Sequence, residues 1–391
     1  MDIIFEFLDR KKYVILRTYL YSVENDWNSI PDQSLNSNNT LLIFFGAADG
    51  RIIESELKNL QRNFPDSLMV GCSTAGEIFN EGLYDDSISL AILKFESSQI
   101  RLVSTKIDET HESRNAGIKL AKELLKDDLK AAFILSEGLL VNGSDLVTGL
   151  NQVLERKVTI TGGLAADGDR FENTWVWNQG QFTSGVIAAI GFYGKNLGFS
   201  HGSRGGWKLL GPDREVTASV DNVLFELDGK PALELYKKHL GELKDDLPAS
   251  GLLFPLAIRS EREDGDIVRT ILAVDESEQS ITFAGNVPKG SCVRLMRASF
   301  DHLVDGAMSA ASGINFSEYK GGDLLSLAIS CIGRRLLLGQ RTEDELEVVM
   351  QELPENCQQI GFYSYGEISP LASGRCDLHN QTMTLTLIWE N

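Results

Sequence analysis

The sequence predicts an α/β protein in which strand–helix–strand–turn–strand units recur and form layered mixed sheets in two related halves. The segment 71–78, Gly-Cys-Ser-Thr-Ala-Gly-Glu-Ile, returns at 361–368 as Gly-Phe-Tyr-Ser-Tyr-Gly-Glu-Ile. In addition, short apolar runs of strand length alternate three times with segments of helical period. Because a repeated segment of this kind indicates a repeated folding unit, we expect related units along the chain.

The N-terminal part precedes the first unit. Residues 1–39 are expected to hold an edge strand over the apolar run 13–20 and then a polar linker rich in turn-forming residues. The run 41–45 is continuously apolar, which is typical of a strand buried on both faces. The first unit is therefore expected to contain a strand at 41–45, a helix over 52–60, a strand at 68–70, the Gly71 turn and a returning strand at 87–95.

The second and third units repeat this order. The second is expected to have a strand at 131–135, a helix capped at Ser144, a strand at 158–160 and a returning strand at 183–193. Its turn, Thr-Gly-Gly-Leu-Ala-Ala-Asp at 161–167, also ends in an acid. The third is expected to have a strand at 324–332, a helix with a capping box at 342–345, a strand at 359–360 and a final strand at 382–388.

Residues 194–230 are expected to cross over between the halves, with 200–207 as a glycine-rich loop. Beyond them the sequence predicts a strand at 252–258, a hairpin of 267–274 with 280–283, and a strand at 292–296. The helix that starts near Phe300 is strongly amphipathic, because its apolar residues recur at helical spacing.

Composition narrows the class of protein. The 391 residues carry a net charge of -19, which argues against nucleic acid or an anionic membrane as the main partner. No apolar run is long enough to span a bilayer, and the start of the chain does not resemble a signal peptide. The five cysteines form no CxxC pair, which indicates reduced thiols. We therefore expect a cytoplasmic protein without membrane insertion.

The recurrent turns are the candidate ligand site, because ligands of open α/β sheets bind at the carboxyl ends of strands. We expect Arg334 and Arg335 to pair with Glu367 or with an anionic ligand. An alternative is that the turns are structural and that their acids cap backbone amides. The candidate ligand-binding residues from these turns and from the end of strand 324–332 are Cys72, Ser73, Thr74, Glu77, Gly163, Asp167, Cys331, Arg334, Tyr363, Tyr365 and Glu367.

Several segments in order resemble the FIST family, a sensory domain of bacterial signal-transduction proteins. The turn 71–78, the turn 161–167 and 227–232 resemble its N-terminal half, expected over 40–225. Segments that resemble the C-terminal half, expected over 226–391, are 285–291, 330–334, 361–368 and 379–382. The resemblance implies a sensor that binds a small, amino-acid-like ligand and signals to a histidine kinase or a cyclic-dinucleotide enzyme. It also makes His379 and Asn380 candidate ligand contacts.

One subgroup of the family binds haem, senses nitric oxide and controls a separate histidine kinase. Haem is therefore a candidate cofactor, and His201 is the candidate ligand of the haem iron. Two other classes remain open: an enzyme that uses Cys72 or Cys331 as a nucleophile, and an interaction scaffold without a ligand. We expect no catalysis, because no nucleophile elbow, P-loop or metalloprotease motif is present.

Overall fold

The computed structural model describes residues 13–154, 157–259 and 266–391. The start of the chain, residues 1–12, was considered above for a signal peptide and lies outside the described residues. Where the apolar run 13–20 predicted a strand, β1 (Ile15–Ser22) forms, next to the short strand β2 (Asp26–Trp27). The sequence boundaries at 39/40 and 225/226 stay predictions.

Three units of the expected kind form the larger part of the molecule. In each, two parallel strands are joined through a helix, and a returning strand pairs antiparallel with the first. The first unit is β3 (Thr40–Gly46), α1 (Glu54–Asn63), β4 (Leu68–Ser73) and β7 (Ser87–Lys94). The second is β9 (Leu129–Ser136), α3 (Gly143–Asn151), β10 (Thr159–Leu164) and β13 (Val186–Tyr193). The third is β23 (Leu324–Cys331), α6 (Ile332–Leu338), α7 (Thr342–Glu352), β24 (Cys357–Ser364) and β27 (Met383–Glu390).

Each unit also sends a hairpin from its turn to the sheet of another unit. These hairpins are β5 (Glu77–Phe79) with β6 (Gly82–Tyr84), β11 (Val176–Asn178) with β12 (Gln181–Thr183), and β25 (Gly366–Pro370) with β26 (Cys376–His379). Strand β5 of the first unit pairs with β24 of the third, β25 of the third pairs with β10 of the second, and β11 of the second pairs with β4 of the first. The exchange is cyclic, so each sheet is completed by a hairpin from another unit.

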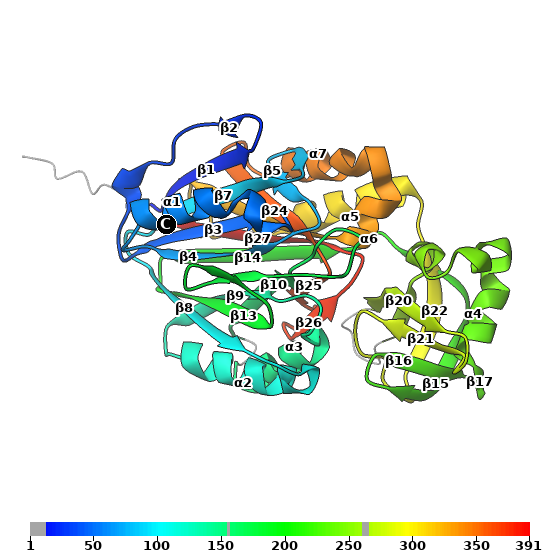
Figure 1. Ribbon diagram of the computed structural model, residues 1–391. Coiled ribbons are helices and arrows are strands. Elements are labelled where there is room, and N and C mark those ends of the chain that lie inside the picture. Colours follow the sequence, from blue (N-terminus) through cyan, green and yellow to red (C-terminus); the bar gives the residue numbers. More distant parts are fainter. Residues whose placement is uncertain (1–12, 155–156, 260–265) are drawn as a thin grey trace, which may run out of the picture.

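One hydrophobic core lies between the three sheets. Phe45 of the first sheet stacks on Phe362 of the third, with ring centroids 4.6 Å apart, and Phe133 of the second belongs to the same cluster. Helix α1 packs on the outer face of the first sheet, as Leu57 and Leu60 show. The helices α2 (Ser113–Leu124), α3, α5 (Phe300–Ser312) and α7 supply apolar residues to a further cluster on the outer faces of the other two sheets. We call this assembly, residues 13–207 and 298–391, the three-sheet body (Figure 1).

A second compact region, residues 208–297, is inserted between β14 (Leu197–Arg204) and α5, and we call it the small domain (Figure 1, right). It has its own core, which includes Val216, Leu224 and Phe283. Its helix is α4 (Ala232–Leu240), followed by the 3-10 helices η4 (Gly241–Asp246) and η5 (Ala249–Leu253). Its strands are β15 (Lys208–Val220), β16 (Val223–Leu227), β17 (Lys230–Pro231), β18 (Leu256–Arg259), β19 (Ile267–Arg269), β20 (Ile271–Asp275), β21 (Ser280–Phe283) and β22 (Cys292–Arg297).

Three local predictions differ from the structure. Residues 200–207 were expected as a loop, but most of them belong to β14, which pairs along its length with β27. This pairing satisfies backbone groups that β27 would otherwise leave unpaired at the edge of the third sheet. The predicted strand 252–258 is only β18, because η5 occupies the residues before it. The capping box at 342–345 does not form, since the Thr342 hydroxyl donates to the carbonyl oxygen of Gly339 at 2.6 Å. The predicted hairpin of β20 and β21 is confirmed.

Candidate functional site

The three recurrent turns converge inside the three-sheet body. The backbone amide of Ala75 donates to the carbonyl oxygen of Tyr363 at 2.9 Å, which joins the first turn to the third. The amide of Ala166 donates to Ser73 at 3.1 Å, which joins the second turn to the first. The amide of Tyr365 donates to Leu164 at 3.2 Å and closes the ring of contacts. The structure therefore brings the three turns, which the sequence placed at strand ends, into contact with one another.

The acids of the two matching turns have equivalent partners. Both oxygens of the buried Glu77 carboxylate accept hydrogen bonds, one from the Thr74 hydroxyl and the other from the amide and hydroxyl of Ser87, at 3.0 and 2.7 Å. Glu367 accepts from the Ser364 hydroxyl at 2.7 Å and from the amide and hydroxyl of Thr382 at 3.1 and 2.9 Å. Each acid therefore links the hairpin that its unit donates to another sheet, β5–β6 or β25–β26, to the start of the returning strand of its own unit, β7 or β27. This geometry matches the structural alternative considered for these turns.

Burial raises the pKa of Glu77 to about 7, although the hydrogen bonds from Thr74 and Ser87 partly oppose it. Burial likewise raises the pKa of Glu367 to about 7, against the hydrogen bonds from Ser364 and Thr382. Both acids are thus close to half protonated at neutral pH and are satisfied within the protein. Neither presents a free carboxylate to a ligand.

The acid of the second turn holds a loop. The Asp167 carboxylate accepts from the backbone amides of Phe171, Glu172 and Asn173 at 3.0, 2.9 and 2.9 Å, and from the hydroxyl of Tyr365. The Phe171 ring stacks on Tyr365 at 4.5 Å between centroids and 10° between planes. Two candidate residues far apart in sequence, Asp167 and Tyr365, therefore fix the loop that follows β10.

Arg334 has a different partner from the expected one. Its guanidinium is fully buried and pairs with Glu345 of α7 at 2.6 Å, not with Glu367. It also donates to the carbonyl oxygens of Gly205 and Leu303, both at 2.7 Å. Sequence reasoning missed this pairing because Glu345 was assigned to a helix cap. Arg335 pairs with Asp85 instead, at 2.6 Å, so both arginines are engaged within the protein.

A cavity of about 770 Å³ lies between the three-sheet body and the small domain, and we call it the interdomain cavity. The body contributes the loop after β10, the start of α5, the end of β23 with α6, the third turn and the residue after β26. The small domain contributes η4, η5 and the start of β20. Three candidate residues line it, namely Cys331, Tyr365 and Asn380. The other candidates do not, and their role in ligand binding stays a prediction.

Three buried polar side chains of this cavity lack hydrogen-bond partners within the described ranges. They are the Asn380 carboxamide, which is fully buried, and the hydroxyls of Thr270 and Ser250, whose residues are 4% and 6% exposed. Burying a polar group without a partner costs about 1–3 kcal/mol, so such groups are rare in native proteins. Six other described residues also have buried polar atoms without partners, but none of them lines this cavity. The three together make the interdomain cavity the candidate ligand site. Sequence reasoning missed Ser250 and Thr270, since neither belongs to a motif.

Two family models match the chain, and the boundary between them falls inside the small domain. The FIST N domain model matches residues 40–230, and the FIST C domain model matches residues 232–370. The chain belongs to the FIST family. FIST domains are sensory domains of signal transduction and, as a family, are non-catalytic. The FIST chain is also 23% identical over 373 residues to uncharacterized protein MJ1623 of Methanocaldococcus jannaschii, across 85% of this chain and 69% of that protein.

Two cysteines of this FIST protein were considered as nucleophiles. Cys72 is fully buried in the core between the sheets, and burial raises the pKa of its thiol well above the usual range. Cys331 lines the interdomain cavity but is 3% exposed, and burial again raises its pKa strongly. Because the thiolate is the reactive form, both thiols are poor nucleophiles at neutral pH.

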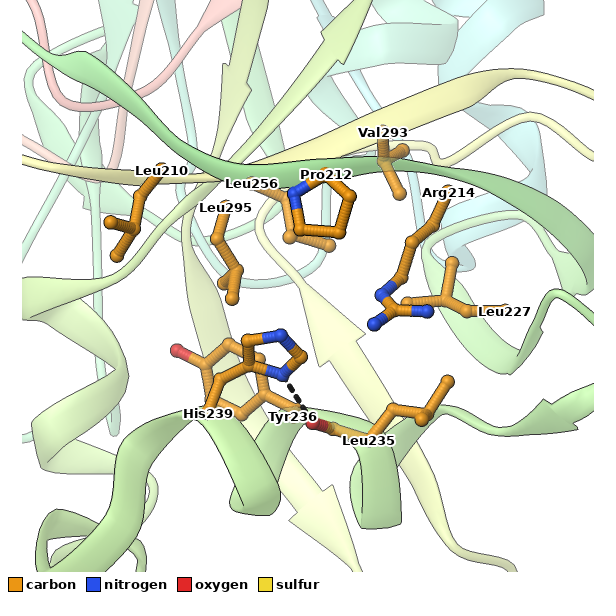
Figure 2. A pocket seen from close by; sticks show the side chains of 10 residues that line it. All are labelled: Leu210, Pro212, Arg214, Leu227, Leu235, Tyr236, His239, Leu256, Val293 and Leu295. Carbon is orange, nitrogen blue, oxygen red and sulfur yellow. Dashed lines mark hydrogen bonds between the residues drawn. The ribbon is translucent and has the colours of Figure 1, made fainter.

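The histidines do not converge on the cavity. His201 lies on β14 opposite Thr386, not in a loop, and burial lowers its pKa. The Nε2 atom of His379 lies 3.0 Å from the carbonyl oxygen of Ser369. Figure 2 shows His239 in a pocket of the small domain, where Nδ1 lies 2.8 Å from the carbonyl oxygen of Leu235. That pocket holds about 20 Å³, room for about one water molecule.

These positions test whether the residues at the cavity fit haem. Of the described residues that line it, none is a histidine or methionine that could bind iron, and none is a cation that could pair with propionates. The other two possible iron ligands, Cys331 and Tyr365, are buried; burial disfavours the Cys331 thiolate, and the Tyr365 hydroxyl already donates to Asp167. The described residues also contain no group of three or more His, Cys, Asp or Glu side chains placed to hold a metal ion. The cavity therefore does not fit haem in the way that the sequence suggested. In the described part of the chain, no helix is long and apolar enough to span a membrane.

Proposed function

We propose that this FIST protein is a cytoplasmic sensor that binds a small ligand in the interdomain cavity and regulates a separate signalling protein. The partner would be a histidine kinase or a cyclic-dinucleotide enzyme, as the family resemblance suggests. The observation that carries the proposal is the convergence of Asn380, Thr270 and Ser250, buried and without partners among the described residues, on one cavity. A ligand that satisfies these groups recovers the free energy that their burial costs.

The position of the cavity supports a sensor rather than a store. Its walls belong to two compact regions with separate cores, which the chain joins at 205–207 and 298–299. A ligand that contacts both walls favours conformations in which the small domain lies against the three-sheet body. The surface available to a partner would then differ between the free and the bound protein.

The alternatives receive less support. An enzyme that uses Cys72 or Cys331 is disfavoured by the raised pKa of both thiols. A scaffold without a ligand does not account for three of the unpaired polar residues lining the same cavity. The haem-based, nitric-oxide-sensing version stays a prediction of the resemblance, and a saturable Soret band on addition of haemin, lost in His201→Ala, would revive it.

A blocking substitution tests the proposal. Leu272 lines the cavity and is 41% exposed, so Leu272→Trp should narrow the cavity and obstruct a ligand without disturbing the fold. Leu209→Trp is the matched control, because Leu209 is also 41% exposed and lies on β15 outside the cavity. Thermal shifts with a library of small metabolites should yield a ligand whose effect survives Leu209→Trp and disappears in Leu272→Trp. A ligand whose shift is equal in both variants would place binding elsewhere.

A further inference from the structure

The charge of the interdomain cavity restricts its ligand. Of the described residues in its wall, none is Lys, Arg or His, whereas Asp169 and Asp246 are exposed at its rim. Carboxylate and phosphate groups are usually held by arginine, lysine or several backbone amides. Two acids without a cation at the rim disfavour an anionic head group. A free amino acid, which carries a carboxylate, is therefore a poor match.

The buried polar end of the cavity is made of carboxamide and hydroxyl groups. Neither the nitrogen nor the oxygen of the Asn380 carboxamide has a partner among the described residues, so it offers both donors and an acceptor. The hydroxyls of Thr270 and Ser250 can each donate one hydrogen bond and accept others. The chemical complement of this set is a neutral group with a donor beside an acceptor.

The remainder of the wall is apolar and partly open. Phe171, Leu272, Phe300 and Leu336 are 45%, 41%, 48% and 45% exposed, although large apolar side chains usually find cover. Phe171 also stacks on Tyr365, which presents an aromatic surface at the same cavity. An apolar ligand body would remove these surfaces from water, at about 25 cal/mol for each Å² covered.

We propose that the ligand is an uncharged small molecule with an apolar or aromatic body and an amide-type head group, bound through Asn380. Thr270 and Ser250 complete the polar end, and the apolar wall covers the ligand body. This inference rests on the proposed function, because it names the chemical class that the same cavity takes. A receptor for free amino acids or other carboxylates would bind a ligand with a charged carboxylate, unlike the uncharged one proposed here.

Three probes with one common body test the head group. They are 3-phenylpropanamide, 3-phenylpropanoate and 3-phenylpropylamine, titrated calorimetrically into the full-length protein. We expect the amide to bind at least 10-fold more tightly than the carboxylate and more tightly than the amine. Asn380→Leu should weaken amide binding about 10-fold, since it removes the groups that would hydrogen-bond to the amide of the ligand.

Thr386→Val is the matched control. The Thr386 hydroxyl is also buried without a partner among the described residues, but Thr386 lies on β27 outside the cavity wall. This variant should leave the Kd of the amide within about twofold, and Thr270→Val repeats the cavity test if Asn380→Leu does not fold. Equal amide binding in wild type and Asn380→Leu, or in Thr270→Val as its substitute, would overturn the inference.

Two further outcomes separate this inference from the proposed function. If the carboxylate or the amine binds best, and Leu272→Trp abolishes that binding, the head group is wrong but the cavity remains a ligand site. If no probe binds the wild type, the inference is overturned, and the library with Leu272→Trp decides the proposed function independently.

Discussion

In the recurrent turns, the buried hydroxyls of Thr74 and Ser364 donate to carboxylates, whereas in the interdomain cavity the hydroxyls of Ser250 and Thr270 have no partner among the described residues. The turns carry the repeated motif, whereas Ser250 and Thr270 belong to no motif. A polar group whose partner is built into the fold stabilises that fold, whereas an unpartnered one lowers stability. In this chain the repeated motif accompanies buried carboxylates whose partners lie within the fold, whereas three of the residues with unpartnered polar groups line one cavity.

The largest effect on stability is expected from Arg334→Leu, because the partners of this buried charge lie within the fold. This substitution leaves Glu345 buried without its cation and leaves two carbonyl oxygens, those of Gly205 and Leu303, without their donor. Breaking a buried ion pair in this way usually costs about 3–5 kcal/mol. We expect a loss of that size in the free energy of unfolding, measured by urea denaturation.

Arg341→Leu is the control for this measurement. Arg341 pairs with Asp301 and Asp344, but its side chain is 44% exposed, so its removal should cost about 0–1 kcal/mol. If the two variants lost equal stability, Arg334 would not be a structural residue, and its candidacy as a ligand contact would be strengthened.

The acids of the turns predict a pH dependence of stability. The pKa values of Glu77 and Glu367 are raised from 4.5 to about 7, so between these pH values the folded state binds more protons than the unfolded state. Their stabilising effect is therefore complete below pH 4.5 and is lost as pH rises to about 7. The shifts correspond to roughly 3 kcal/mol for each carboxyl. Urea midpoints measured between pH 4.5 and 8 should show this fall.

Replacing both acids isolates their share of the pH dependence. In the double variant Glu77→Gln/Glu367→Gln, stability should fall less between pH 4.5 and 7 than in the wild type, because glutamine does not titrate. Glu352→Gln, at an exposed position of α7, should leave the pH profile unchanged. A double variant with the wild-type profile would show that these acids are not protonated in the folded protein.

Much of the fold could be predicted from the sequence, because period and turn chemistry are local. The continuous apolar run 41–45 predicted a strand with two buried faces, and β3 is buried throughout. The hairpin exchange could not be predicted, since nothing local in 77–79 distinguishes pairing with β24 from pairing with β4. The strand β14 was missed for a related reason. The glycines in 200–207 are typical of a loop, and the pairing with β27 that makes this segment a strand is not visible in the local sequence.

The candidate site was predicted only in part. The motifs indicated Cys331, Tyr365 and Asn380, and these line the interdomain cavity. The acids and Arg334 were proposed as ligand contacts because no charged partner for them is evident in the sequence. In the folded protein, their partners are other side chains of the same chain. Ser250 and Thr270 could not be found, since their lack of partners is a property of the packed structure and not of any spacing.

The contrast between partnered and unpartnered hydroxyls predicts different effects of the same substitution in the two regions, Thr74→Val and Thr270→Val, on the free energy of unfolding. Thr74→Val removes the hydroxyl that donates to Glu77 and accepts from the amide of Gly76, so we expect a loss of about 1–3 kcal/mol. Thr270→Val removes an unpartnered buried hydroxyl, so stability should stay within about 0.5 kcal/mol of the wild type or rise. A loss in Thr270→Val as large as that in Thr74→Val would show that the Thr270 hydroxyl has a partner within the folded protein and is not free to bind a ligand.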